Sequence, residues 1–76
     1  MKKKDVKKKN LMTVEVYSTI KDENAKKNLK KSPLWLSAYT KEEVEEEDFN
    51  FDELWKYTIK FDGVTPIYLT KVERVI

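Results

Sequence analysis

The chain has 76 residues, with 16 Lys and Arg, 14 Asp and Glu, one Gly, and neither His nor Cys. This length holds one domain at most, and the lack of Cys excludes disulfides and thiolate metal sites. The lack of His removes the commonest general base, and a single Gly cannot build a phosphate-binding loop. We therefore expect no enzyme, no cofactor and no metal site. The absence of a signal or membrane-spanning segment predicts a cytoplasmic, intracellular protein.

The charges are sorted along the chain. Residues 1–31 contain eleven Lys and four acidic residues, for a net charge of +7. Residues 41–53 contain eight acidic residues and one Lys, for a net charge of −7, and residues 54–76 add +2. Fifteen of the sixteen cations are Lys, which attracts a polyanion as a point charge but reads base sequence poorly. The overall charge of +2 therefore describes neither half of a dipolar chain.

The N-terminal half predicts a tail, a strand and a short turn. Residues 1–10 contain six Lys and little to bury, which predicts a flexible, disordered basic tail. Apolar and polar residues then alternate over residues 11–21, which indicates a half-buried strand. Asp22 is suited to begin a short helical turn, although a loop fits the same residues. Ser32–Pro33 is expected to end that turn, because Pro disfavours helical geometry in the residue before it.

The middle of the chain predicts a second strand, a helix and a third strand. Residues 34–39 alternate in polarity, as in a strand. Thr40, followed three positions later by Glu43, has the form of a capping box, so we expect a short acidic helix over residues 41–48. Alternation returns over residues 54–61, which predicts another strand.

A hairpin is expected at the C-terminal end. Asp62–Gly63 lies between alternating segments and is a strong signal for a two-residue loop. Because Pro66 has no N–H for a ladder, the last strand should lie at an edge of the sheet or pair only through its other side. A loop at these two residues predicts four opposite pairs: Phe61 and Val64, Ile59 and Pro66, Tyr57 and Tyr68, and Trp55 and Thr70.

Together these elements predict a small α+β fold. It comprises the basic tail over residues 1–10 and a single domain over residues 11–76. The domain is expected to hold a three- to four-stranded, mainly antiparallel sheet with one or two short helices on one face.

The acidic run is the main candidate for a binding site. Dense carboxylates steer a protein toward a basic surface, and aromatic residues among them supply apolar anchors. On a helix, the charges recur at a spacing similar to the roughly 1.7 Å of axis per phosphate in duplex DNA, so the run is also a candidate nucleic-acid mimic. We name it the acidic strip, and it consists of Glu42, Glu43, Glu45, Glu46, Glu47, Asp48, Phe49, Phe51, Asp52 and Glu53.

We therefore expect a non-enzymatic interaction protein that binds a basic surface of a nucleic-acid-handling host protein. By analogy with the small inhibitors of viruses and other mobile genetic elements, it would act as an inhibitor or adaptor. The competing interpretation is a solvated helix face whose charge is balanced by Lys of the same chain. Ion pairs between the acidic strip and those lysines would remove the expectation of an external partner.

Two alternatives use the basic half of the chain. One is a homodimer in which the basic and acidic segments of two copies meet. The other is a nucleic-acid-binding module for DNA or RNA with little sequence specificity. No membrane partner is expected. The candidate nucleic-acid-binding residues are Lys2, Lys3, Lys4, Lys7, Lys8, Lys9, Lys26, Lys27, Lys30 and Lys31.

Overall fold

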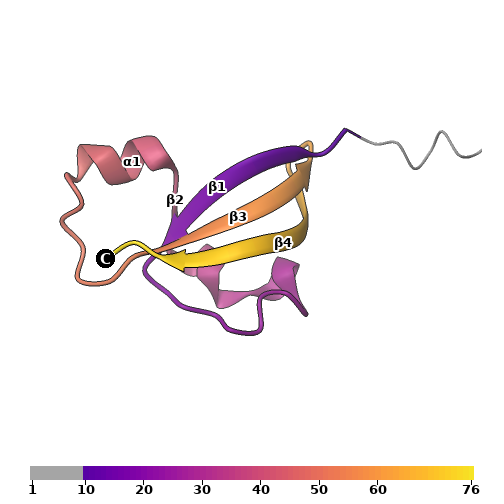
Figure 1. The fold of residues 1–76 in the computed structure, drawn as a ribbon, viewed down its shortest axis with the longest axis horizontal. Coiled ribbons are helices and arrows are strands. Elements are labelled where there is room, and N and C mark those ends of the chain that lie inside the picture. The colour runs from indigo at the N-terminus through magenta and orange to yellow at the C-terminus, as the bar shows by residue number, and fades with distance from the viewer. Residues whose placement is uncertain (1–9) are drawn as a thin grey trace, which may run out of the picture.

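A four-stranded sheet forms the body of the protein in a computed structural model that describes residues 10–76 (Figure 1). Each strand runs antiparallel to its neighbours, in the order β2-β1-β3-β4. The predicted small α+β fold is confirmed. The predicted basic tail lies outside the described residues, apart from Asn10. The elements are β1 (Met12–Ser18), the 3-10 helices η2 (Leu29–Lys31) and η3 (Pro33–Ser37), β2 (Ala38–Tyr39), α1 (Lys41–Glu46), β3 (Trp55–Asp62) and β4 (Thr65–Arg74).

Strand β1 forms where the alternation of the sequence predicted it. It pairs with β3 along its whole length, from Met12 opposite Phe61 to Ser18 opposite Trp55. At Ser18 the chain turns away from β3, and the buried Ser18 hydroxyl donates a hydrogen bond of 2.9 Å to the carbonyl of Leu34. This bond ties the end of β1 to the covering segment, residues 19–37, which lies over one face of the sheet.

The segment between β1 and β2 is held by turns rather than by a regular α-helix. Asp22 Oδ1 accepts a hydrogen bond from the backbone N–H of Asn24, which is the local turn that Asp and Asn favour. The chain then forms η2, and Ala25 and Leu29 are buried against the sheet. The loop alternative considered for residues 22–31 is therefore closer to the structure than the helical turn.

The strand predicted over residues 34–39 is wrong for most of its length. Residues 33–37 form η3 instead, and only Ala38 and Tyr39 join the sheet as β2. Ser32 caps η3, because its hydroxyl accepts from the N–H of Leu34 at 3.1 Å, and Pro33 occupies the first turn, where no N–H donor is needed. Ser32–Pro33 thus begins a helix as well as ending a turn. The alternation of polarity over residues 34–39 is too short to distinguish a 3-10 helix followed by a short strand from one continuous strand.

The loop of the predicted hairpin is shifted by one residue. Asp62 pairs with Thr65, so the loop consists of Gly63 and Val64 rather than Asp62–Gly63. Gly63 has a φ of +66°, as expected for Gly at the first position of a two-residue hairpin loop. Val64 is 93% exposed at the tip.

The four predicted pairs between β3 and β4 are wrong, because the loop is shifted by one residue and β4 contains two extra residues. Phe61 lies opposite Pro66, Ile59 opposite Leu69, Tyr57 opposite Val72 and Trp55 opposite Arg74. The register shifts between Lys60 and Phe61 and again between Thr58 and Ile59, which leaves Ile67 and Thr70 of β4 without a partner in β3. The edge position expected for the strand that contains Pro66 is confirmed.

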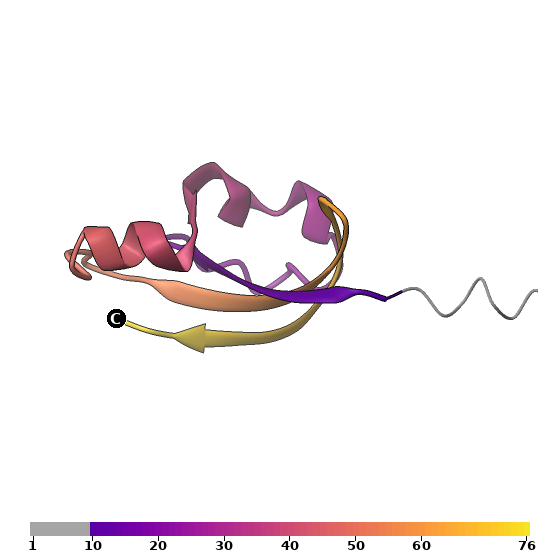
Figure 2. The same ribbon diagram turned by 90° about the horizontal axis from the view of Figure 1, so that it is seen from above.

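Two apolar clusters stabilise the domain. The larger cluster packs Ala25, Leu29 and Leu34 of the covering segment onto Tyr57 and Ile59 of β3 and Leu69 of β4. The smaller cluster joins Tyr17, Val44 and Leu54 where α1 meets the end of β1. Figure 2 shows α1 and both 3-10 helices on the same side of the strands, which leaves the opposite face of the sheet uncovered.

Gly63→Ala is expected to destabilise the protein by about 1–2 kcal/mol. No atom lies within 4 Å of a Cβ built at this position, so the cost comes from the positive φ and not from a steric clash. Urea unfolding measures the change, with Val64→Ala as the control at the exposed loop tip. Equal stability of the two variants would show that the loop does not require Gly.

Candidate functional site

The acidic strip begins on α1, which is capped as the sequence predicts. Thr40 Oγ1 accepts from the N–H of Glu43 at 3.1 Å, and Glu43 Oε1 accepts from the N–H of Thr40 at 2.8 Å. Both halves of the capping box are therefore present. Val44 is the one buried residue of this helix, so the other side chains of α1 face solvent.

The end of α1 is strained. The N–H of Phe49 bonds to the carbonyl of Val44, and the N–H of Asp48 bonds to that of Glu45, which is the pattern of a Schellman motif. That motif requires a residue with positive φ, and here Asp48 (φ 58°) and Phe49 (φ 55°) both adopt it without being Gly. The helix consequently ends at Glu46, two residues before the expected end, and the acidic strip continues as a loop.

The acidic residues of the strip are turned toward solvent, with one exception. Glu53 is half-buried, and its Oε2 accepts a hydrogen bond of 2.5 Å from the indole N–H of Trp55. The exposed acidic members are Glu42, Glu43, Glu45, Glu46, Glu47, Asp48 and Asp52.

The two aromatic residues of the acidic strip have different surroundings. Phe51 is half-buried and packs edge to face on Tyr39, with 5.3 Å between the ring centroids. It therefore belongs to the smaller apolar cluster and is not a free anchor. Phe49 is 47% exposed and lies in the loop among the carboxylates. Phe49 is the side chain of this strip that can offer apolar surface to a partner.

No ion pair joins the acidic strip to a cation within residues 10–76. The ion pairs of this part of the chain lie elsewhere: Lys56 contacts Glu15 at 3.5 Å and Glu73 at 3.2 Å on the uncovered face of the sheet. Lys71 also contacts Glu73, at 3.1 Å. Within this part of the chain, the acidic strip therefore has no cationic ion-pair partner.

The electrostatics of the uncovered sheet face are locally balanced. The Lys71 ammonium, followed by that of Lys56, holds the pKa of the Glu73 carboxyl below its usual value. The hydrogen bond to Glu73, together with the charge of Glu15, raises the pKa of Lys56 above its usual value. These cations are engaged with sheet carboxylates and do not neutralise α1.

Four of the ten lysines named for nucleic-acid binding can be placed. Lys26, Lys27, Lys30 and Lys31 are exposed on the covering segment, and none forms an ion pair with another described residue. The other six candidates, which are Lys2, Lys3, Lys4, Lys7, Lys8 and Lys9, lie outside the described residues.

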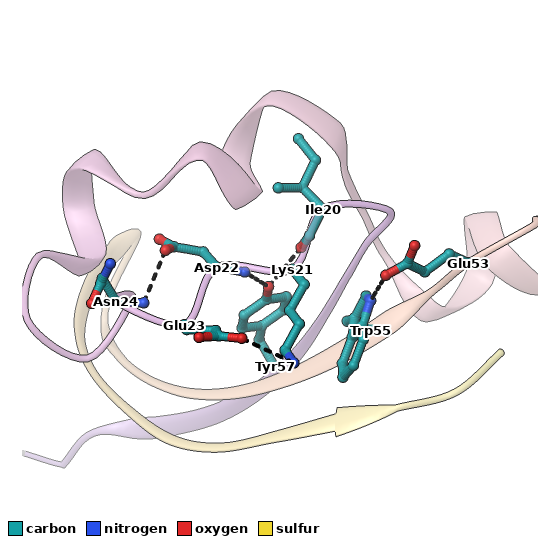
Figure 3. A network of polar contacts seen from close by, with 8 residues as sticks. All are labelled: Ile20, Lys21, Asp22, Glu23, Asn24, Glu53, Trp55 and Tyr57. Atoms are coloured by element: carbon teal, nitrogen blue, oxygen red, sulfur yellow. Dashed lines mark hydrogen bonds and ion pairs between the residues drawn. The ribbon is translucent and has the colours of Figure 1, made fainter.

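An open pocket of about 370 Å³ lies between the covering segment and the sheet. Lys21 Nζ sits 4.8 Å from the centre of the Trp55 ring and 3.2 Å from a carboxylate oxygen of Glu23 (Figure 3). Lys21 and Glu23 of the pocket wall thus form an ion pair with each other. Sequence reasoning missed this arrangement, because no local pattern indicates that Lys21 will lie over a ring 34 positions later. The lining residues are Lys21, Asp22, Glu23, Lys26, Trp55, Leu69 and Val72.

Tyr57 anchors the covering segment beside this pocket. Its ring is fully buried, while its hydroxyl accepts from the N–H of Asp22 at 2.9 Å and donates to the carbonyl of Ile20 at 2.6 Å (Figure 3). Burial raises the pKa of this hydroxyl above its usual value, because the phenolate would lose its hydration. Tyr57 therefore has a structural role.

No protein-family model, no curated protein and no solved structure matches the chain. In the part of the chain that the structure describes, no helix is long and apolar enough to cross a membrane. The same residues contain no group of three or more acidic side chains placed to hold a metal ion.

Asp48→Gly is expected to raise the free energy of unfolding by about 0.5–1 kcal/mol, because Gly adopts positive φ without steric cost. Asp48→Ala is the matched variant, since it removes the same charge but keeps a Cβ. We expect the Gly variant to be more stable than the Ala variant by about 1 kcal/mol in urea unfolding. An Ala variant as stable as the Gly variant would contradict the positive φ at this position.

Tyr57→Phe is expected to cost about 1–3 kcal/mol at pH 7, because it leaves the N–H of Asp22 and the carbonyl of Ile20 unpaired. The raised pKa also gives this loss a pH dependence. The stabilisation from the protonated hydroxyl is fully present below the usual Tyr pKa of 10.0. It is lost as the pH rises through the higher pKa that the hydroxyl has in the folded protein. The difference between wild type and variant should therefore shrink above about pH 10. Chemical unfolding at pH 7, 9 and about 11 measures it, and a constant difference would contradict this role.

Proposed function

We propose that the protein is a non-enzymatic inhibitor or adaptor. It binds a basic surface of another protein, of the nucleic-acid-handling class, through the acidic strip. The observation that supports this proposal most is the exposure of the strip's carboxylates without a cationic partner among residues 10–76. Such a surface attracts a basic partner at long range and accelerates encounter, with a strong dependence on salt.

The charge at the C-terminal end of α1 opposes the helix dipole. The last turn of a helix favours cations, yet α1 has no basic residue there. Glu45, Glu46 and Glu47 instead place three carboxylates at the negative end of the helix. This arrangement destabilises the free protein, and a local rule is most often broken in this way at functional sites. Cations of a partner would relieve the repulsion on binding.

The strip also offers one apolar contact at its centre. Phe49 is exposed, and positive φ in a bulky residue is energetically unfavourable. Aromatic residues that become buried on binding contribute much of the energy of protein interfaces. We therefore assign attraction to the carboxylates and short-range anchoring to Phe49. The phosphate-like spacing expected on a long helix applies only to α1, which spans six residues, so the proposal does not depend on nucleic-acid mimicry.

Nucleic-acid binding through the lysines remains the second candidate. Lys26, Lys27, Lys30 and Lys31 are exposed on one segment and unpaired with other described residues, as phosphate-binding side chains must be. The acidic strip would repel the same phosphates. This repulsion is the reason that we place protein binding first.

Neutralising the acidic strip is expected to abolish capture of a protein partner while the fold remains intact. The variant replaces Glu42, Glu43, Glu45, Glu46 and Glu47 by Gln, and Gln at position 43 preserves the capping box. Immobilised wild type and variant are incubated with nuclease-treated lysate of the native host, and the captured proteins are compared by mass spectrometry. Phe49→Ala should weaken the same capture by about tenfold or more, as expected for an aromatic anchor.

A smaller matched pair controls for net charge. Glu45→Gln with Glu46→Gln alters the strip, whereas Glu15→Gln with Glu23→Gln removes the same charge elsewhere. The first pair should weaken capture, and the second should leave it unchanged. Equal capture by both would contradict the proposal. The second candidate would be supported instead if the wild type captured no protein from nuclease-treated lysate but bound labelled DNA or RNA at about 50 mM salt.

A further inference from the structure

The two edges of the sheet differ in how well they are protected. Among residues 10–76, β2 pairs only with Tyr17 and Ser18 of β1. Within the described part of the chain, residues 12–16 of β1 therefore have β3 on one side and no strand on the other, and Figure 1 shows open space beside this part of β1. An edge strand presents a row of unpaired backbone donors and acceptors, which can accept another strand.

The opposite edge carries features that prevent strand addition. Strand β4 contains Pro66, two register shifts, and the charged Lys71 and Arg74. Proline, bulges and Lys are the usual means by which proteins block an edge. Residues 12–16, with the sequence Met-Thr-Val-Glu-Val, contain no Pro, bulge or Lys, their one charged residue is Glu15, and their register with β3 is unbroken. The unprotected edge is thus confined to β1.

We propose that residues 12–16 of β1 pair with the same residues of a second copy of the chain, antiparallel and centred on Val14. This pairing uses all five residues that lack a neighbouring strand on this side, and it is symmetric about a twofold axis. It places Met12 opposite Val16 of the second copy and Thr13 opposite Glu15. The two sheets then form one continuous sheet through the dimer. This inference goes beyond the proposed function and does not depend on it.

The side chains of β1 fit a second copy better than an unrelated strand. In the proposed register each Glu15 lies opposite a neutral Thr13, so no like charges meet, which would destabilise the pair. Met12 is 62% exposed in the free chain and gains an apolar neighbour across the new pair. The edge also accepts antiparallel strands already, because β2 pairs with Tyr17 and Ser18 in this orientation. Five residues bury little area, so the association is weak and reversible.

Substitutions at position 13 distinguish the association of two copies from the folding stability of one copy. Thr13 lies opposite Lys60 in its own chain and accepts a hydrogen bond from the Lys60 ammonium. Thr13→Glu adds an attraction within the chain but places Glu opposite Glu15 of the second copy, twice per dimer. Thr13→Lys instead repels Lys60 within the chain and attracts Glu15 of the second copy. Association and folding stability should therefore change in opposite directions, so misfolding cannot account for the result.

Sedimentation velocity from about 10 μM to 1 mM measures the association, with urea unfolding of the same variants as the stability readout. Thr13→Lys should tighten the dimer by about 2- to 30-fold, and Thr13→Glu should weaken it by a similar factor, since each dimer contains two such pairs. Thr70→Glu and Thr70→Lys on β4 are the matched controls and should leave association unchanged. Because backbone hydrogen bonds carry the contact, the dimer should persist at about 0.5 M salt.

Several outcomes would overturn the proposal. A wild-type chain that stays monomeric at about 1 mM has no such edge contact. Weakening by Thr13→Lys would exclude the register centred on Val14. Association that disappears at high salt would indicate contact between the acidic and basic segments of two copies. Association that responds to the changes at Thr70 would place the contact on β4.

Discussion

The whole arrangement depends on the buried ring of Tyr57 and the two hydrogen bonds of its hydroxyl. The covering segment has no α-helix and few buried residues, so it has little stability of its own. Tyr57 supplies apolar surface at the centre of the larger cluster and also fixes the backbone where the segment leaves β1. Together with Ile59 and Leu69, Tyr57 forms the surface on which Ala25 and Leu29 pack.

The acidic strip is supported from the same sheet by a separate, smaller cluster. Val44 and Phe51 hold the helix and the loop against Tyr17, Leu54 and Tyr39. The acidic side chains of the strip face solvent, except that of Glu53. The segment that bears these charges is therefore anchored to the sheet by the smaller apolar cluster. Changes to the exposed carboxylates can therefore alter binding while leaving the larger cluster undisturbed.

Features that depend on neighbours in sequence were predictable. The strands at residues 11–21 and 54–61, the capping box at Thr40 and Glu43, and the edge position of the strand with Pro66 all follow from local patterns. The exposure of the acidic strip was likewise expected from its polarity. Whether its carboxylates pair with distant lysines depends on tertiary contacts, and no local pattern reports those contacts.

Errors in the sequence-based expectations arose where two structures fit one pattern. Ser32–Pro33 both ends a turn and begins η3, and the six residues after it satisfy either a strand or a 3-10 helix. Exposed Leu36, at 84%, shows that the alternation there did not reflect burial. The register of the hairpin depended on two extra residues in β4, which leave no mark in an alternating sequence.

Those two extra residues also affect how the gene for this protein can change. In a strand with unbroken alternation, deletion of one codon turns every later side chain to the wrong face of the sheet. Deleting Ile67 or Thr70 would instead join two stretches of regular ladder that already have compatible register on β3. The C-terminal strand can thus lose a residue at either place while Val72 keeps its position opposite Tyr57. Length variation in descendants of this chain is expected to concentrate at these two codons.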